Sequence, residues 1–184
     1  MAEDKVDQAS ERVRARMTEG KVDRVSGRAR ARMTEPFEAG VVVRDLELME
    51  RFYGEVLGCR PVHRSRIPAS VGVPAGLGDE LLVVWLQVPS GGCVKLIQPR
   101  SSPSPAPPVL PLTARRGLSY LTFHLDDMDP VVAALAAGGA RPLSDPVVVW
   151  ARGRRISFWA DPEGNALELA DERGGVRGAG RSEA

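Results

Sequence analysis

The feature that most constrains the fold of this chain is a succession of predicted elements that occurs twice. Residues 37–43 (FEAGVVV) are strand-like, and Asp45 can cap the helix that follows, whose apolar face ends at Gly58. Three strand-like segments come next, over residues 60–66, 81–88 and 93–98. The first half of the chain is therefore predicted to contain a strand, a helix and three strands.

The same order returns after a Pro- and Ser-rich segment. Residues 99–111 lack too many backbone donors to continue a central sheet, so they predict a linker. Beyond it come a strand over 118–125, an Ala-rich helix over 129–137, and strands near 146–150, 154–159 and 165–170. Asp45 aligns with Asp127, which indicates that the two halves are related modules.

The first 36 residues stand apart, because residues 5–20 and 21–36 match at 11 of 16 positions. Each copy is Arg-rich and has few large apolar side chains, so it cannot bury enough surface to offset its ordering entropy. We expect a disordered or loosely helical arm; a basic tether for an acidic partner or RNA is the alternative. The predicted organisation is an N-terminal arm (1–36), a first module (37–98), a linker (99–116), a second module (117–171) and a flexible tail (172–184).

Composition narrows the function classes. The formal net charge is +1, which gives no global electrostatic case for binding nucleic acid or an anionic membrane. No run approaches the roughly 20 apolar residues of a membrane span, and the N-terminus is charged. Cys59 and Cys93 are the only cysteines, so there is no disulfide framework and no thiolate zinc cluster. We expect a cytoplasmic protein with no nucleic-acid and no membrane partner.

Two motifs carry a resemblance to a known family. GVVVRDLELMERFYGEVLG, at 40–58, and FWADPEGNALEL, at 158–169, are similar to the vicinal oxygen chelate superfamily, the glyoxalase and bleomycin-resistance proteins. The resemblance covers about residues 37–171. It implies an α+β fold in which two βαβββ modules form a curled, mixed-sheet cup.

In metal-dependent members of that superfamily, the first and last strands of each module direct His, Glu, His and Glu into the cup. Carried over by position, the resemblance places Glu38, Lys95, Tyr120 and Glu168 at these four sites, so only Glu168 keeps the ligand type. A protonated Lys has no lone pair for a metal and repels a cation. We therefore expect no cofactor. If a divalent metal did bind, its ligands would be Glu38, Tyr120 and Glu168.

The same four residues can serve acid–base chemistry, with the Lys95 ammonium where a metal would stand. A buried ion pair that only fills an abandoned metal site is the structural alternative. Strand alternation puts Thr122 and His124 on the face of Tyr120, as candidate substrate-binding residues. Further candidates for the pocket wall are Trp85 and either Phe158 or Trp159, and residues 66–80 are long enough to form a lid.

These residues leave several functions open. The first is a metal-independent isomerase, cyclase or lyase acting on a small hydrophobic carbonyl compound, such as one of natural-product metabolism. The alternative is a non-catalytic protein that sequesters an antibiotic or other small molecule, as bleomycin-resistance proteins do. A metal-dependent epimerase, glyoxalase or dioxygenase is disfavoured by Glu38, Lys95 and Tyr120. The resemblance also implies a possible homodimer, in which modules pair within a chain or across the two chains.

Overall fold

The computed structural model describes residues 23–25, 28–30, 33–145, 148–149 and 155–171. The chain separates into two compact units, residues 1–36 and 37–184. In the first unit, β1 (Asp23–Val25) pairs with β2 (Arg28–Arg30) in an antiparallel hairpin, where we had expected disorder. The remainder of the predicted disordered arm up to residue 32, and the predicted flexible tail over 172–184, lie outside the described residues.

The first module has the predicted order of a strand, a helix and three strands. Its sheet runs β3-β6-β5-β4, with β3 parallel to β6 and the other pairs antiparallel. A short helix, α3, lies between β4 and β5 within the segment predicted to be a lid. The bounds are β3 (Glu38–Val42), α2 (Leu46–Leu57), β4 (Arg60–Ile67), α3 (Ala69–Gly72), β5 (Leu81–Gln87) and β6 (Cys93–Pro99).

Helix α2 begins and ends where its sequence predicts. The Asp45 carboxylate accepts a hydrogen bond from the Leu48 backbone N–H at 2.9 Å, which satisfies one of the unpaired donors of the first turn. Gly58 ends the helix with φ of 68°, a conformation that glycine adopts without a steric penalty. Between them, Met49 and Tyr53 are completely buried. The helix therefore covers one face of the first sheet with its apolar side.

The second module repeats this arrangement less regularly. Its sheet runs β7-β11-β10-β8, with β9 also paired to β10 and β7 parallel to β11. The strand predicted near 146–150 is described only as the two-residue β9, and the two-residue β8 was not predicted. The bounds are β7 (Leu121–Leu125), α4 (Asp129–Ala137), β8 (Arg141–Pro142), β9 (Val148–Val149), β10 (Arg155–Ala160) and β11 (Ala166–Asp171).

Strand register confirms that the two modules are internal repeats. In the first module Gly40 pairs with Lys95, and in the second Thr122 pairs with Glu168. The alignment of Asp45 with Asp127 places Gly40 opposite Thr122, and Lys95 is the predicted equivalent of Glu168. The fold is α+β, with two mixed sheets of equivalent topology.

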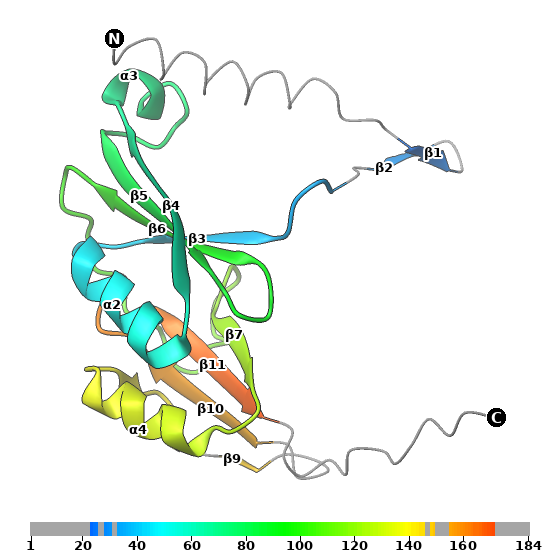
Figure 1. Cartoon of the computed structure of the whole chain (residues 1–184), viewed down its shortest axis with the longest axis vertical. Coiled ribbons are helices and arrows are strands. Elements are labelled where there is room, and N and C mark those ends of the chain that lie inside the picture. The colour runs from blue at the N-terminus through cyan, green and yellow to red at the C-terminus, as the bar shows by residue number, and fades with distance from the viewer. Residues whose placement is uncertain (1–22, 26–27, 31–32, 146–147, 150–154, 172–184) are drawn as a thin grey trace. The chain divides into compact units, whose positions relative to one another are not determined.

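One hydrophobic core joins the two modules. Helices α2 and α4 lie on the same side of the sheets, and buried residues from both modules belong to one cluster (Figure 1). The Phe123 ring on β7 meets the Tyr53 ring on α2 edge to face, with centroids 6.4 Å apart. The faces of the sheets that point away from the helices are therefore the ones that this core leaves uncovered.

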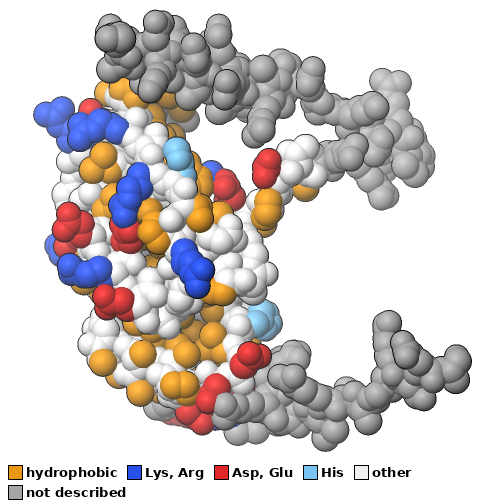
Figure 2. Space-filling model, in the orientation of Figure 1, with side chains coloured by type: hydrophobic (Ala, Val, Ile, Leu, Met, Phe, Trp, Pro, Cys, Tyr) orange, Lys and Arg blue, Asp and Glu red, His pale blue; other side chains and the backbone are white. Residues whose placement is uncertain are grey.

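Two further features of the described residues are the distribution of surface charge and the hydrophobicity of the helices. On the described part of the face in Figure 2, Lys and Arg side chains are interspersed with Asp and Glu, and no patch of one sign covers it. Among the described residues, no helix is long and apolar enough to cross a membrane.

Candidate functional site

The open face of the first sheet carries a row of polar and aromatic side chains, one from each strand. Lys95 pairs with Trp85, and Trp85 pairs with His63, so alternation places all three on one face. The Lys95 ammonium forms an ion pair with Glu38 and lies 5.4 Å from the centroid of the Trp85 ring. The His63 ring lies 4.8 Å from the Trp85 ring. We call Glu38, His63, Trp85 and Lys95 the Lys95 cluster.

The ion pair in this cluster is partly open to solvent. The side chain of Lys95 is 30% exposed and that of Glu38 is 37% exposed. The ion pair of the structural alternative is therefore present, but it is not fully buried. Because solvent screens such pairs, breaking this one costs at most about 1 kcal/mol of folding stability. A loss of function on mutation can then be separated from a loss of fold.

The open face of the second sheet carries a second group. Phe158, Glu168 and Thr122 pair in one row across β10, β11 and β7. The Thr122 hydroxyl donates to Glu168 Oε2 at 2.5 Å, and the Tyr120 and Phe158 rings meet edge to face with centroids 5.2 Å apart. We call Tyr120, Thr122, Phe158 and Glu168 the Glu168 cluster. His124 lies exposed on the same face, paired with Ala170 one row further along.

Glycine at position 40 explains why Lys95 and Glu168, which occupy equivalent positions on β6 and β11, bond differently. Gly40 has no side chain, so the Lys95 opposite it reaches diagonally to Glu38. At the equivalent place in the second module Thr122 has a hydroxyl, which engages Glu168 directly. The repeated backbone therefore holds two chemically different pairs.

Two predicted placements need correction. Trp159 faces the core, is only 3% exposed, and donates from its indole N–H to Ser157 Oγ at 2.7 Å. It therefore does not line the open face, whereas Phe158 does. Tyr120 precedes β7 instead of lying within it. His63 was not among the predicted site residues, because it lies among Arg60, Arg64 and Arg66 on a strand expected to have a solvated face. Its position beside Trp85 depends on a register shift between Pro61 and His63.

The DPEGN turn between β10 and β11 is held by a buried carboxylate. Asp161 is 1% exposed and accepts hydrogen bonds from the Glu163 and Asn165 backbone N–H groups at 3.0 and 2.8 Å. Its other oxygen accepts from the Asn165 amide at 2.9 Å and from the Tyr53 hydroxyl at 3.2 Å. Burial raises the pKa of Asp161 above its usual value, and these hydrogen bonds oppose that shift. The motif is thus primarily structural, and it ties the second module to α2.

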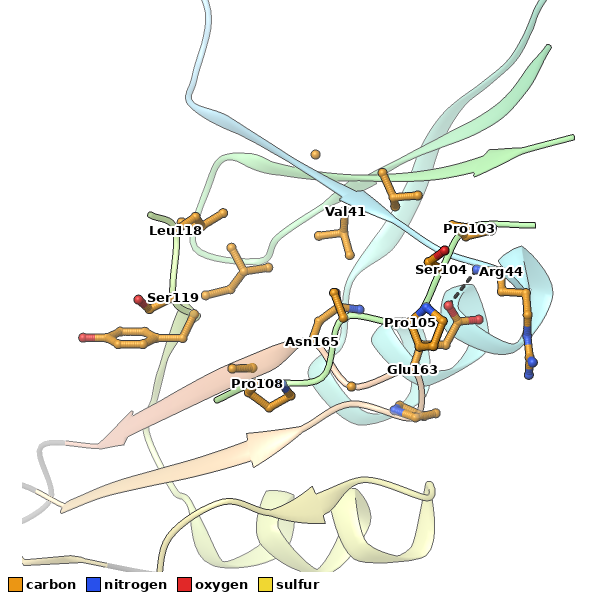
Figure 3. Close-up of a pocket in the computed structure, with 18 of the residues that line it drawn as sticks. Val41, Arg44, Pro103, Ser104, Pro105, Pro108, Leu118, Ser119, Glu163 and Asn165 are labelled. Atoms are coloured by element: carbon orange, nitrogen blue, oxygen red, sulfur yellow. Dashed lines mark hydrogen bonds between the residues drawn. The ribbon is translucent and has the colours of Figure 1, made fainter. Parts of the chain in front are cut away.

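Glu163 in the same turn makes a second connection between the modules. Its two carboxylate oxygens accept from the backbone N–H groups of Arg44 and Asp45, each at 2.6 Å. Figure 3 shows the hydrogen bond to Arg44. A carboxylate is favoured beside the N-terminus of a helix, where the backbone dipoles are positive. The turn of the second module therefore anchors the start of α2 in the first.

A cavity of about 630 Å³ lies beside this turn, between β3, the linker and the start of β7 (Figure 3). We call it the junction cavity. Tyr120 is the only one of the predicted site residues that lines it. The junction cavity and the two polar clusters are therefore different places.

Comparison with models of known protein families shows which family the chain belongs to. The model of the Glyoxalase/Bleomycin resistance protein/Dioxygenase superfamily matches residues 38–158, which is more than half of the chain. The chain belongs to this superfamily. Its members bind small-molecule ligands. No curated protein sequence matches the chain significantly.

Solved structures agree with this superfamily fold. A glyoxalase family protein from Bacillus cereus is 22% identical with a TM-score of 0.67, and the match covers 80% of this chain and 98% of that one. A glyoxylase/bleomycin resistance protein/dioxygenase domain from Frankia sp. EAN1pec is also 22% identical, with a TM-score of 0.58 and coverage of 80% and 96%. The trypanothione-dependent glyoxalase I of Leishmania major is 18% identical, with a TM-score of 0.56 and coverage of 77% and 88%. At these identities the likeness shows the fold alone.

The four positions at which metal-dependent members of the superfamily carry ligands do not suit a divalent metal here. The ammonium of Lys95 forms an ion pair with Glu38, and Glu168 accepts a hydrogen bond from the Thr122 hydroxyl. In the part of the chain that the structure describes, no three His, Cys, Asp or Glu side chains are placed to hold a metal ion. Nor does any hydrogen bond or ion pair among the described residues join the Lys95 cluster to the Glu168 cluster.

Proposed function

We propose that the protein binds a small, planar organic molecule on the open faces of its two sheets, without a metal. One observation carries this proposal: each open face presents aromatic rings beside a charged side chain. On the first face these are Trp85 and Lys95, and on the second they are Phe158, Tyr120 and Glu168. Half-buried rings offer stacking area at little entropic cost, and an adjacent charge orients one polar atom of the ligand.

The charges also limit the chemistry of the ligand. Lys95 is already neutralised by Glu38, and Glu168 already accepts one hydrogen bond. A second full charge on the ligand would have to displace one of these partners. A neutral aromatic or conjugated compound with a carbonyl or enolisable oxygen fits this arrangement best, with its oxygen facing the ammonium of Lys95.

A homodimer would complete the site. Because the Lys95 cluster and the Glu168 cluster lie on separate sheets, we propose that each faces the other cluster of a second copy. A two-fold axis would then create two equivalent cups, since such an interface uses the same surfaces on both chains. This arrangement would surround the ligand with aromatic rings from both modules.

Acid–base catalysis in the same cup is the second candidate, and the position of Glu168 favours it. The Thr122 hydroxyl fixes one oxygen of Glu168 at 2.5 Å, which leaves the other oxygen to take a proton from a ligand. Lys95 would stabilise the developing oxyanion, and Tyr120 would donate to it. Such a site would isomerise or eliminate on an enolisable carbonyl compound without a metal.

We further propose that the protein acts in the cytoplasm. The support is chemical: Cys59 and Cys93 are both free thiols, as expected in a reducing compartment.

Capture of a ligand tests the proposed function. The purified protein is incubated with a metabolite extract, and bound compounds are measured by native mass spectrometry. Binding predicts a captured compound of defined mass; release of an altered compound identifies the enzyme, and release of the same compound identifies the binding protein. Lys95→Met and Glu168→Gln should each reduce capture at least tenfold, a change of about 1.4 kcal/mol.

The matched control is Glu55→Gln, at an exposed position on α2. Glu55→Gln should capture as much ligand as the parent chain does. All three variants should have melting temperatures within a few degrees of the parent chain, because the Lys95–Glu38 ion pair is partly exposed. Undiminished capture by a folded Lys95→Met chain would exclude the role proposed for Lys95.

A further inference from the structure

We propose that the junction cavity is a second binding site, separate from the cup, for an amphipathic carboxylate: a single carboxyl group on a compact apolar body. The cavity volume of about 630 Å³ lies within the range of sites for small organic ligands, roughly 300–1,000 Å³. The class of ligand follows from the apolar wall, the charge balance and the hydrogen-bonding groups of the lining.

The apolar wall consists of side chains that the fold leaves uncovered. Leu118 is 78% exposed, Val42 is 53% exposed and Tyr120 is 38% exposed, and all three line the cavity. In Figure 3, Leu118 and Ser119 stand on one side of the hollow, and Pro103 and Pro105 of the linker stand on the other. Exposed apolar side chains that converge on one cavity favour an apolar ligand body, because burying them removes that surface from water.

The charge balance of the lining is positive. Arg44 and Arg115 line the cavity, and no ion pair of either guanidinium occurs among the residues described. Glu163 is the single acidic residue of the lining, and both its oxygens are occupied by the backbone N–H groups of Arg44 and Asp45. The guanidinium of Arg44 points away from the hollow in Figure 3, so we assign the ligand's carboxylate to Arg115.

The remaining polar groups complement an acceptor. The hydroxyls of Ser102, Ser104 and Ser119 can all donate, whereas the Asn165 amide is already committed to Asp161. A guanidinium and hydroxyl donors in the lining of one cavity suit a carboxylate, which accepts hydrogen bonds and donates none. A cationic amphiphile would instead place its charge against Arg115.

This site is independent of the proposed function in the cup. Glu38, Lys95, Trp85 and Glu168 do not line the cavity, and Tyr120 is the one residue shared with the two clusters. Variants of Lys95 and Arg115 can therefore test the cup and the junction cavity separately.

Titration of the full chain with octanoate, measured by isothermal titration calorimetry, tests the proposal. We expect saturable binding of one octanoate per chain, with octanol and octyltrimethylammonium at least tenfold weaker. Arg115→Gln should weaken octanoate at least tenfold. The control is Arg116→Gln, which removes the same charge from the neighbouring position that does not line the cavity; it should change the affinity less than twofold.

Four results would overturn the proposal. Three are no saturable binding of octanoate, equal binding of octanol, and equal weakening by Arg115→Gln and Arg116→Gln, which would indicate non-specific charge attraction. The fourth concerns Lys95→Met. Lys95→Met separates the two sites, because it should leave octanoate binding unchanged. If octanoate binding is lost in Lys95→Met and kept in Arg115→Gln, the carboxylate binds in the cup and the junction site does not exist.

Discussion

At the scale of single residues, the buried side chain of Asp161 accepts several hydrogen bonds that hold the DPEGN turn. Four donors converge on its buried carboxylate: two backbone N–H groups, the Asn165 amide and the Tyr53 hydroxyl. In Asp161→Asn, the side chain keeps its shape but replaces one acceptor oxygen with a donor that faces other donors. We expect a loss of about 1–3 kcal/mol in the free energy of unfolding, the cost of buried donors left without acceptors.

Urea denaturation monitored by circular dichroism measures that loss. The matched control is Asp145→Asn, the same chemical change at an exposed position in the second module, which should stay within about 0.5 kcal/mol of the parent chain. Equal stabilities of the two variants would show that the Asp161 network contributes nothing to folding.

Cys59 supplies a pH prediction at the same scale. Burial raises the pKa of its thiol to about 11, with the neighbouring Cys93 adding to the shift. An acid with a raised pKa stays protonated to higher pH, so at pH 8 only about one-thousandth of Cys59 is thiolate, the reactive form. With a thiol reagent at pH 8, the half-buried Cys93 should react first, and the rate at Cys59 should rise about tenfold per pH unit toward pH 11.

Peptide mass mapping after timed labelling assigns each modified thiol. Labelling in urea is the control, because unfolding should make the two cysteines react at similar rates. Faster labelling of Cys59 than of Cys93 in the folded protein would contradict its burial.

Residue positions were predictable from sequence only where local rules decide them. A strand's period of two places Thr122 on the face of Glu168's cluster, and helix capping identifies Asp45 and Gly58. Glu163 was visible only as a turn residue, because its partners lie on a segment more than 100 residues away in sequence. The choice between Phe158 and Trp159 stayed open for a related reason: which of two adjacent aromatic residues faces the core depends on strand register, and a shift of one residue reverses it.

At the scale of elements, α2 depends on a contact from the opposite module. Two carboxylates hold its N-terminus. Asp45 accepts from the Leu48 backbone N–H in the first turn, and Glu163 of the second module accepts from the backbone N–H groups of Arg44 and Asp45 just before the helix. Glu163→Ala removes both charge-assisted hydrogen bonds, and we expect a loss of about 1–3 kcal/mol in the free energy of unfolding. Hydrogen exchange should rise most at the N-terminus of α2.

Glu55→Ala is the control for Glu163→Ala. It removes the same side chain from an exposed position near the other end of α2, and its effect should stay within about 0.5 kcal/mol. Unchanged exchange at Arg44 and Asp45 in Glu163→Ala would show that the carboxylate does not hold this segment.

Elements were predicted where their signals are long. The 12-residue α2 and the seven-residue β5 and β6 have clear periodicity and turn residues at their ends. The two-residue β8 has no period at all, and it exists because Arg141 and Pro142 lie beside β10 in the folded chain. Pairing of this kind is a tertiary contact, so it is invisible to local patterns.

At the scale of the whole molecule, the two modules have the same backbone arrangement but different side chains at equivalent positions of their open faces. The two modules share strand order and register, yet Gly40 and Lys95 on one correspond to Thr122 and Glu168 on the other. The sequence repeat predicted the scaffold because hydrophobic patterns recur in both halves. It did not predict the junction cavity, whose lining comes from both modules and the linker.

Complementation between two inactive variants distinguishes a cup shared by two chains from a cup within one chain. If the Lys95 cluster of one chain faces the Glu168 cluster of its partner, a heterodimer of Lys95→Met and Glu168→Gln chains has one doubly altered cup and one intact cup. Random exchange of equal amounts makes about half of the dimers mixed, so about a quarter of the cups should be intact, as two-fold symmetry requires. Capture of the ligand by the mixture, relative to either variant alone, measures this recovery, and native mass spectrometry of chains with different masses confirms exchange. A mixture of Lys95→Met with itself is the control. If heterodimers form without any recovery of capture, each chain completes its own cup and the two-chain arrangement is wrong.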